Sequence, residues 1–158
     1  MVIFFSGGDM HTEIVLLILT IAAEIGIPKY FALSIAINEN DKLDPIAISK
    51  KNDDGSYDFG VMQLSGRYIY EFIGEYWDKD WEFNWQSPYD NIYIGCKHLK
   101  KLSTMEKINT WYGVAIAYNA GYSRVNDPPE TTIEYAARVM EKYVELSNGK
   151  YQVIVPGK

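Results

Sequence analysis

The strongest constraint on the fold is the apolar segment of residues 30–38, because Glu39 follows it directly. Pro28 is favoured in the first turn of a helix, where its missing N–H would be unsatisfied in any case. Pro45 ends the helical pattern after about Asn40. The sequence therefore predicts a buried helix that carries a carboxyl group at its C-terminal end.

A second apolar run, residues 14–23, is too short to span a membrane, which takes about 20 apolar residues. Acidic residues precede it and no Lys or Arg does, which is the wrong flank for a signal peptide. We expect no stable membrane insertion and find no export signal. We interpret the run as the first core helix, capped by Thr12 and stopped by Gly26.

The composition is that of one globular domain of 158 residues. Lys and Arg number 15 against 21 Asp and Glu, and no basic cluster is present, so nucleic acid is excluded as a partner. Cys96 is alone and is predicted to be a packed thiol. His11 and His98 lack metal-ligand spacing and are interpreted as surface residues. We predict no metal, no cofactor and a monomer.

The remaining pattern predicts a mainly helical chain with one small sheet. Asp54-Gly55 is a tight-turn signal, so we expect a hairpin whose return strand is residues 57–59. Trp77, Trp81 and Trp85 form one stripe if their segment is helical, and a loop with tucked-in aromatic rings is the alternative. Helices are expected over residues 65–76, 89–102, 103–118 and 131–148, with caps at Ser65, Ser103 and Thr131.

We predict three parts in the chain: a loosely held leader (1–11), a folded domain (12–148) and a tail (149–158). Residues 151–155 of the tail either pair as an edge strand or pack down onto the domain.

Five short motifs stand in order within residues 21–143, and the first three are Ala47-Ile48-Ser49, Gly60-Val61-Met62-Gln63-Leu64 and Asn91-Ile92 with Gly95 and Leu99. Together the motifs resemble the lytic transglycosylase (SLT-type) domain of the lysozyme superfamily. The last of them are Ala-Tyr-Asn-Ala-Gly followed by Arg-Val, and Thr-x-x-x-Tyr-x-x-x-Val. One departure follows Glu39, where the family usually has Ser and this chain has Asn40. The matching segments are residues 47–49, 60–64, 91–99, 117–125 and 131–139.

The resemblance implies an α+β lysozyme-like fold, with a helical lobe, a β-hairpin lobe and a cleft between them. It implies cleavage of the bond between N-acetylmuramic acid and N-acetylglucosamine in peptidoglycan strands, with a 1,6-anhydro product. Glu39 is then the general acid and later the base. The residues implied to bind or line the substrate are Ser49, Gly60, Met62, Gln63, Tyr118, Asn119 and Tyr135. Action on peptidoglycan implies the cell envelope, periplasmic or extracellular.

Glu39 has a chemical reason to serve as an acid. Burial disfavours the charged form of a carboxyl group and raises its pKa toward neutrality. The alternative is an exposed Glu at a helix end, where it opposes the helix dipole.

Asp58 keeps a second mechanism open. The link between Ser49 and Gly60 is longer than in typical transglycosylases and is similar to that of animal-type lysozymes, where an Asp two residues before the Gly is the second catalytic carboxylate. Asp58 stands at that position, so a hydrolytic muramidase is an alternative. A capping role in the hairpin turn competes with it. A glycan-binding protein without turnover is the third possibility.

Overall fold

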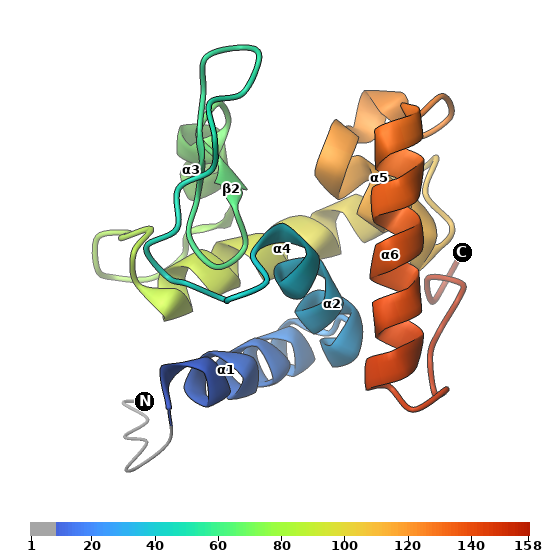
Figure 1. The fold of residues 1–158 in the computed structure, drawn as a ribbon, viewed down its shortest axis with the longest axis horizontal. Coiled ribbons are helices and arrows are strands. Elements are labelled where there is room, and N and C mark those ends of the chain that lie inside the picture. The colour runs from blue at the N-terminus through green and yellow to red at the C-terminus, as the bar shows by residue number, and fades with distance from the viewer. Residues whose placement is uncertain (1–8) are drawn as a thin grey trace.

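The structure is a computed structural model that describes residues 9–158 (Figure 1). The predicted leader therefore falls almost wholly outside the described residues. The elements, in chain order, are α1 (Met10–Ile25), α2 (Lys29–Glu39), β1 (Asp58–Phe59), β2 (Leu64–Ser65), α3 (Ile69–Tyr76), α4 (Pro88–Thr104), α5 (Trp111–Ala120), the 3-10 helix η1 (Tyr122–Arg124) and α6 (Glu130–Leu146). The predicted class, mainly helical with a small β-hairpin lobe, is confirmed.

Helix α1 begins slightly earlier than predicted. The Asp9 side chain accepts a hydrogen bond from the backbone N–H of Thr12 at 2.7 Å, so Asp9 rather than Thr12 is the cap. Gly26 ends the helix in a left-handed conformation, φ 85°, as its position predicted. Within residues 9–158 no helix is long and apolar enough to cross a membrane.

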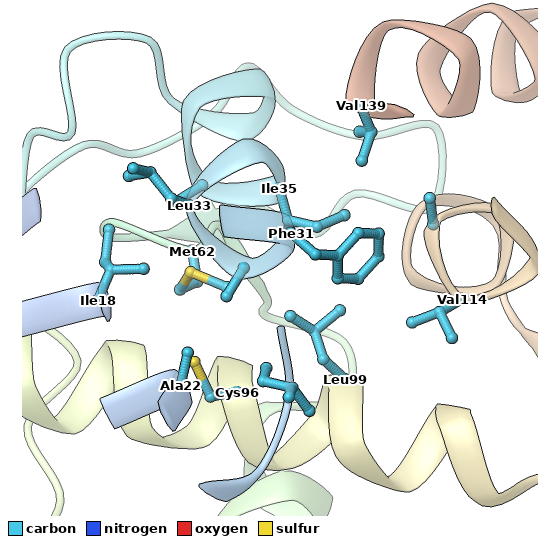
Figure 2. Packing of buried hydrophobic residues seen from close by; sticks show 14 of the residues in the cluster. Ile18, Ala22, Phe31, Leu33, Ile35, Met62, Cys96, Leu99, Val114 and Val139 are labelled. Atoms are coloured by element: carbon cyan, nitrogen blue, oxygen red, sulfur yellow. The ribbon is translucent and has the colours of Figure 1, made fainter. Parts of the chain in front are cut away.

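Helix α2 is the centre of the helical lobe, packed against α1 and α6 (Figures 1 and 2). Phe31 is fully buried, with its ring 5.1 Å from Trp111 of α5 and 5.7 Å from Tyr143 of α6. The buried side chains of Ile18, Leu99 and Val139 come from α1, α4 and α6. Burial on all sides explains why this helix is apolar almost throughout.

The hairpin lobe is smaller than a regular sheet. Strands β1 and β2 pair antiparallel, Asp58 with Ser65 and Phe59 with Leu64. The predicted turn at Asp54-Gly55 is present, but its two arms form one isolated β-bridge, Ile48 with Phe59, instead of a strand pair. The principal pairing therefore lies on the other side of residues 58–59 and was not predicted.

Three further predicted helix caps, besides Thr12, are wrong. The hydroxyl of Ser103 lies inside α4 and donates to the Lys100 carbonyl oxygen at 2.6 Å. Helix α5 starts later and is capped by Thr110, whose hydroxyl accepts from the Gly113 N–H at 3.0 Å. Ser65 belongs to β2, and Thr131 lies inside α6. Ser103 and Thr131 are each followed by Glu three residues later, but neither segment forms a capping box.

The tryptophan segment is a loop, the second of the two alternatives. Its rings tuck together: Trp77 donates from Nε1 to the Trp81 carbonyl oxygen at 2.8 Å and contacts Phe83 edge-on. The tail packs down with a single bridge, Thr110 with Ile154, and Val155 is buried.

Candidate active-site cleft

A cleft of about 590 Å³ lies between the hairpin lobe and the helical lobe. In Figure 1 its two sides are the β2 and α3 region and the end of α5. Among the sequence-predicted site residues, those lining it are Glu39, Asp58, Gln63, Tyr118 and Asn119. The fold thus brings together residues that are widely separated in sequence.

Glu39 ends helix α2 and is only partly exposed. Burial raises the pKa of its carboxyl group to about 7, although a hydrogen bond from Tyr135 opposes the shift. That bond runs from the Tyr135 hydroxyl to Oε1 at 2.7 Å. The negative charge of Asp58 raises the pKa further. Tyr135 is buried, so it holds the carboxyl group from behind.

Asn40, which follows Glu39, links the two lobes. Its amide donates to the carbonyl oxygen of Asp44 at 2.9 Å and to that of Gly60 at 3.3 Å. These bonds fix the segment that leaves α2 against the hairpin lobe. Sequence reasoning treated Asn40 only as a departure from the family and missed this role.

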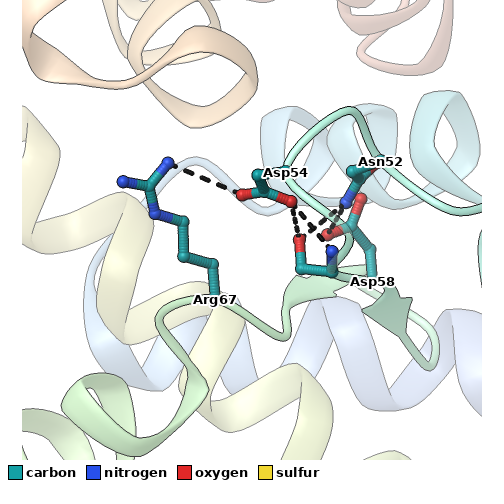
Figure 3. A network of polar contacts seen from close by, with 5 residues as sticks. Asn52, Asp54, Asp58 and Arg67 are labelled. Carbon is teal, nitrogen blue, oxygen red and sulfur yellow. Dashed lines mark hydrogen bonds and ion pairs between the residues drawn. The ribbon is translucent and has the colours of Figure 1, made fainter.

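Asp58 belongs to a polar network at the base of the long turn (Figure 3). Its Oδ1 accepts from the Asn52 amide at 3.2 Å, and its backbone N–H donates to the Ser49 hydroxyl at 2.9 Å. Burial raises the pKa of Asp58; the Asn52 hydrogen bond lowers it and the charge of Asp54 raises it. Asp54 in turn lies 3.5 Å from Nη1 of Arg67. Ser49 therefore holds the backbone of Asp58 in place. Ser49 itself does not line the cleft.

The turn of residues 60–63 is clamped by Asn91, which is fully buried in α4. Asn91 accepts from the Met62 N–H at 2.8 Å and donates to the Phe59 carbonyl oxygen at 2.9 Å. Gly60 has φ +77°, and a Cβ on it would collide with the Asn91 amide. Met62 is fully buried. Gly60 and Met62 support the wall of the cleft from behind.

The polar side chains of this wall are fixed in different ways. Gln63 has a positive φ of 50°, and its amide donates to the Gly60 carbonyl oxygen at 3.0 Å. The Tyr118 hydroxyl donates to the Met62 carbonyl oxygen at 2.6 Å, and this bond fixes the ring in the lining of the cleft. Asn119 is exposed and accepts from the Thr132 hydroxyl at 2.8 Å.

The interpretation of His98 as a surface residue is wrong. Its ring lies in the cleft wall, half-buried, 4.4 Å from the ring of Phe72. Cys96, two residues earlier in α4, is fully buried, and burial raises the pKa of its thiol to about 12. Across residues 9–158 no group of three or more His, Cys, Asp or Glu side chains is placed to hold a metal ion.

Residues 17–141 match the family described as the transglycosylase SLT domain. No curated protein sequence matches the chain. Among solved structures, it is similar to an inactive mutant of the lytic transglycosylase Slt from Pseudomonas aeruginosa, with a TM-score of 0.69 and 19% identity over 92% of this chain. It is also similar to the 70 kDa soluble lytic transglycosylase from Escherichia coli, with a TM-score of 0.55 and 20% identity over 84% of this chain.

The chain spans 25% of the first of these proteins and 21% of the second. At this identity the two structures establish the lysozyme-like fold. The family match extends over most of the chain and agrees with the region that the sequence motifs delimit. The chain therefore belongs to the transglycosylase SLT domain family.

Proposed function

We propose that the protein is a peptidoglycan lytic transglycosylase with Glu39 as its general acid and then its base. The observation that carries the proposal is a carboxyl group in the cleft whose pKa is raised to about 7. At neutral pH such a group is protonated in part of the molecules and ionised in the rest. It is therefore matched to both donating and accepting a proton.

In the first step the Glu39 carboxyl group gives its proton to the glycosidic oxygen, and the bond from that oxygen to the anomeric carbon of N-acetylmuramic acid breaks. In the second step the carboxylate removes the proton of the 6-hydroxyl of the same sugar. The 6-oxygen then bonds to the anomeric carbon and closes a 1,6-anhydro ring. Glu39 regains its proton, and no water is consumed.

The surrounding residues support this chemistry. The Tyr135 hydrogen bond fixes the orientation of the carboxyl group, since it holds Oε1 at 2.7 Å. We assign substrate positioning to Gln63, Tyr118 and Asn119, which line the cleft. Ser49, Gly60 and Met62 act behind them, through backbone contacts. A substrate of peptidoglycan strands places the protein in the cell envelope, periplasmic or extracellular.

The test is mass spectrometry of the soluble muropeptides released from purified peptidoglycan. We expect products lighter by one water than reducing muropeptides. Glu39→Gln should lower their rate of release by at least about 100-fold, the usual range for losing a general acid. The control is Glu24→Gln, which alters an exposed carboxyl group of α1. Full activity in folded Glu39→Gln would overturn the assignment.

Hydrolysis is the second candidate, because Asp58 lines the same cleft and its charge acts on Glu39. A retaining hydrolase needs such a second carboxylate as nucleophile or cation stabiliser. In that case the products carry reducing ends, and Asp58→Asn loses about as much activity as Glu39→Gln. Asp53→Asn, in the same turn but exposed, is the control. Glycan binding without any product would instead indicate a non-enzymatic binding protein.

A further inference from the structure

His98 lines the same cleft and has no role in the function proposed above. It projects from α4 into a wall of aromatic rings, 4.4 Å from Phe72 and 5.8 Å from Tyr118 between ring centroids. Burial raises the pKa of the Tyr118 hydroxyl, and the negative charge of Glu39 raises it further, so Tyr118 lies near Glu39. His98 is therefore separated from the surroundings of Glu39 by one aromatic side chain.

The two nitrogens of the His98 ring have different environments. Nδ1 lies 2.9 Å from the Tyr76 hydroxyl. Nε2 has no hydrogen-bond partner among residues 9–158. It is not fully buried. Because His98 lines the cleft, Nε2 is accessible from it. One nitrogen is thus fixed by the protein and the other is open to a ligand.

The Tyr76 hydroxyl can donate to Nδ1 or accept from it, and among residues 9–158 it has no other acceptor for its hydrogen. Burial raises its pKa to about 12, so the hydroxyl is protonated and can donate to Nδ1. An imidazole that accepts at Nδ1 carries its proton on Nε2. Burial also lowers the pKa of His98 to about 4, which leaves the ring neutral. The charged side chains nearby, Glu75 and Lys101, pair with each other at 3.4 Å.

We propose that His98 contacts the glycan, donating a hydrogen bond from Nε2 to a hydroxyl or acetamido oxygen of an N-acetylated sugar. This inference rests on the proposed function and adds a specificity residue to the same cleft. A neutral donor beside aromatic rings suits an uncharged sugar, whose faces pack on rings and whose oxygens accept hydrogen bonds. In this proposal Tyr76 is the positioning residue, since its donation to Nδ1 leaves the ring proton on Nε2.

The first test is nitrogen-15 NMR of the two histidine side chains in Glu39→Gln, with a chitooligosaccharide as probe. We expect the His98 ring to show a proton on Nε2, and its Nε2 signal to shift when the sugar binds. The exposed His11 is the internal control and should not move. A proton on Nδ1, or an unmoved His98 signal while backbone amides of the cleft shift, would overturn this inference alone. Unmoved cleft amides would overturn the proposed function with it.

The second test separates contact from structure through kinetics. His98→Phe keeps an aromatic ring against Phe72 and removes the donor, so KM should rise about three- to tenfold, the value of one neutral hydrogen bond, with kcat little changed. His98→Gln places an amide N–H at similar reach and should restore KM. Tyr76→Phe should raise KM and mix the two tautomers in the NMR spectrum. Equal KM values in all these folded variants and in a His11→Ala control would overturn the contact.

Discussion

Glu39 is under two opposing influences from its surroundings. Burial favours its neutral form, whereas the Tyr135 hydroxyl stabilises its charged form by a hydrogen bond of 2.7 Å. Burial prevails, and the pKa is raised to about 7. Tyr135 thus keeps the pKa of a buried acid from rising beyond the range in which it can also act as a base.

Tyr135→Phe should move the pKa of Glu39 above about 7, because it removes the hydrogen bond that favours the carboxylate. The measurement is the pH profile of kcat/KM. The side of this profile that is set by the ionisation of Glu39 should shift to higher pH. Tyr143→Phe is the matched control, since Tyr143 is a second buried tyrosine of α6 and its hydroxyl accepts from the Gln152 N–H. An unshifted profile in folded Tyr135→Phe would contradict the role of Tyr135.

Glu39 should also make the stability of the protein depend on pH. Its pKa rises from 4.5 to about 7 on folding, so between these values the folded state holds more protons and stability falls as pH rises. Glutamine has no carboxyl group to ionise, so Glu39→Gln should not lose stability as the pH rises through this range. Near pH 4 the variant and the unmodified chain should unfold alike. At about pH 8 the variant should be more stable by roughly 3 kcal/mol, since each pKa unit corresponds to about 1.4 kcal/mol.

Urea unfolding at the two pH values measures the difference. The Glu24→Gln variant should follow the unmodified chain at both, because Glu24 is exposed on α1. If Glu39→Gln gained no stability at the higher pH, the burial of the carboxyl group would not cost free energy as the structure indicates.

Among the elements, the contact of α4 with the turn of residues 60–63 decides where the cleft wall stands. Gly95 of α4 packs directly on Met62, whose carbonyl oxygen accepts from the Tyr118 hydroxyl. A side chain at residue 95 would push the turn away from α4. Displacement of Met62 would therefore reach Tyr118 and the cleft.

Gly95→Ala should destabilise the protein by about 1–3 kcal/mol, the usual cost of overpacking a core. The added Cβ would lie 2.7 Å from Cγ and 2.8 Å from Cβ of Met62, which is fully buried. The matched control is Gly74→Ala in α3, where a Cβ meets nothing within 4 Å. That variant should gain about 0.5–1 kcal/mol from helix propensity. Equal urea midpoints for the two variants would contradict the packing argument.

The sequence predicted the helices better than their ends. Continuous apolar runs located α1 and α2. Apolar periodicity located α4 and α6, because burial of one face leaves a pattern that a short window reveals. The caps at Ser103 and Thr131 were wrong, since a hydroxyl can equally bond back to its own helix.

Contacts between distant residues lay beyond the sequence. The bond from Tyr135 to Glu39 joins residues 96 apart, and the resemblance predicted only that both residues belong to the site. The place of His98 depends on how α3 and α5 pack beside α4, which no local pattern records. No signal in the sequence distinguished it from a surface histidine.

At the scale of the whole molecule, the tail packs on the helical lobe and lies outside the cleft that holds Glu39. Trp111 donates its backbone N–H to the Val153 carbonyl oxygen at 3.1 Å, and Val155 donates to that of Asn109 at 2.9 Å. Within residues 9–158, the cleft lining includes no residue of the tail. We therefore expect the tail to contribute to stability without contacting a ligand in the cleft.

Deletion of residues 151–158 should lower the free energy of unfolding by about 2 kcal/mol, the value of burying one valine side chain, with muropeptide release unchanged below the melting point. The deletion leaves Gly149, which closes α6 through its N–H to the Val144 carbonyl oxygen at 3.0 Å, in place. Val155→Ala is the point-substitution control and should show part of the same loss, because Val155 is only 5% exposed. Urea unfolding and the muropeptide assay measure the two quantities separately. Lost activity in a folded deletion variant would mean that the tail orders the cleft through α5, since the tail pairs with the residues that begin that helix.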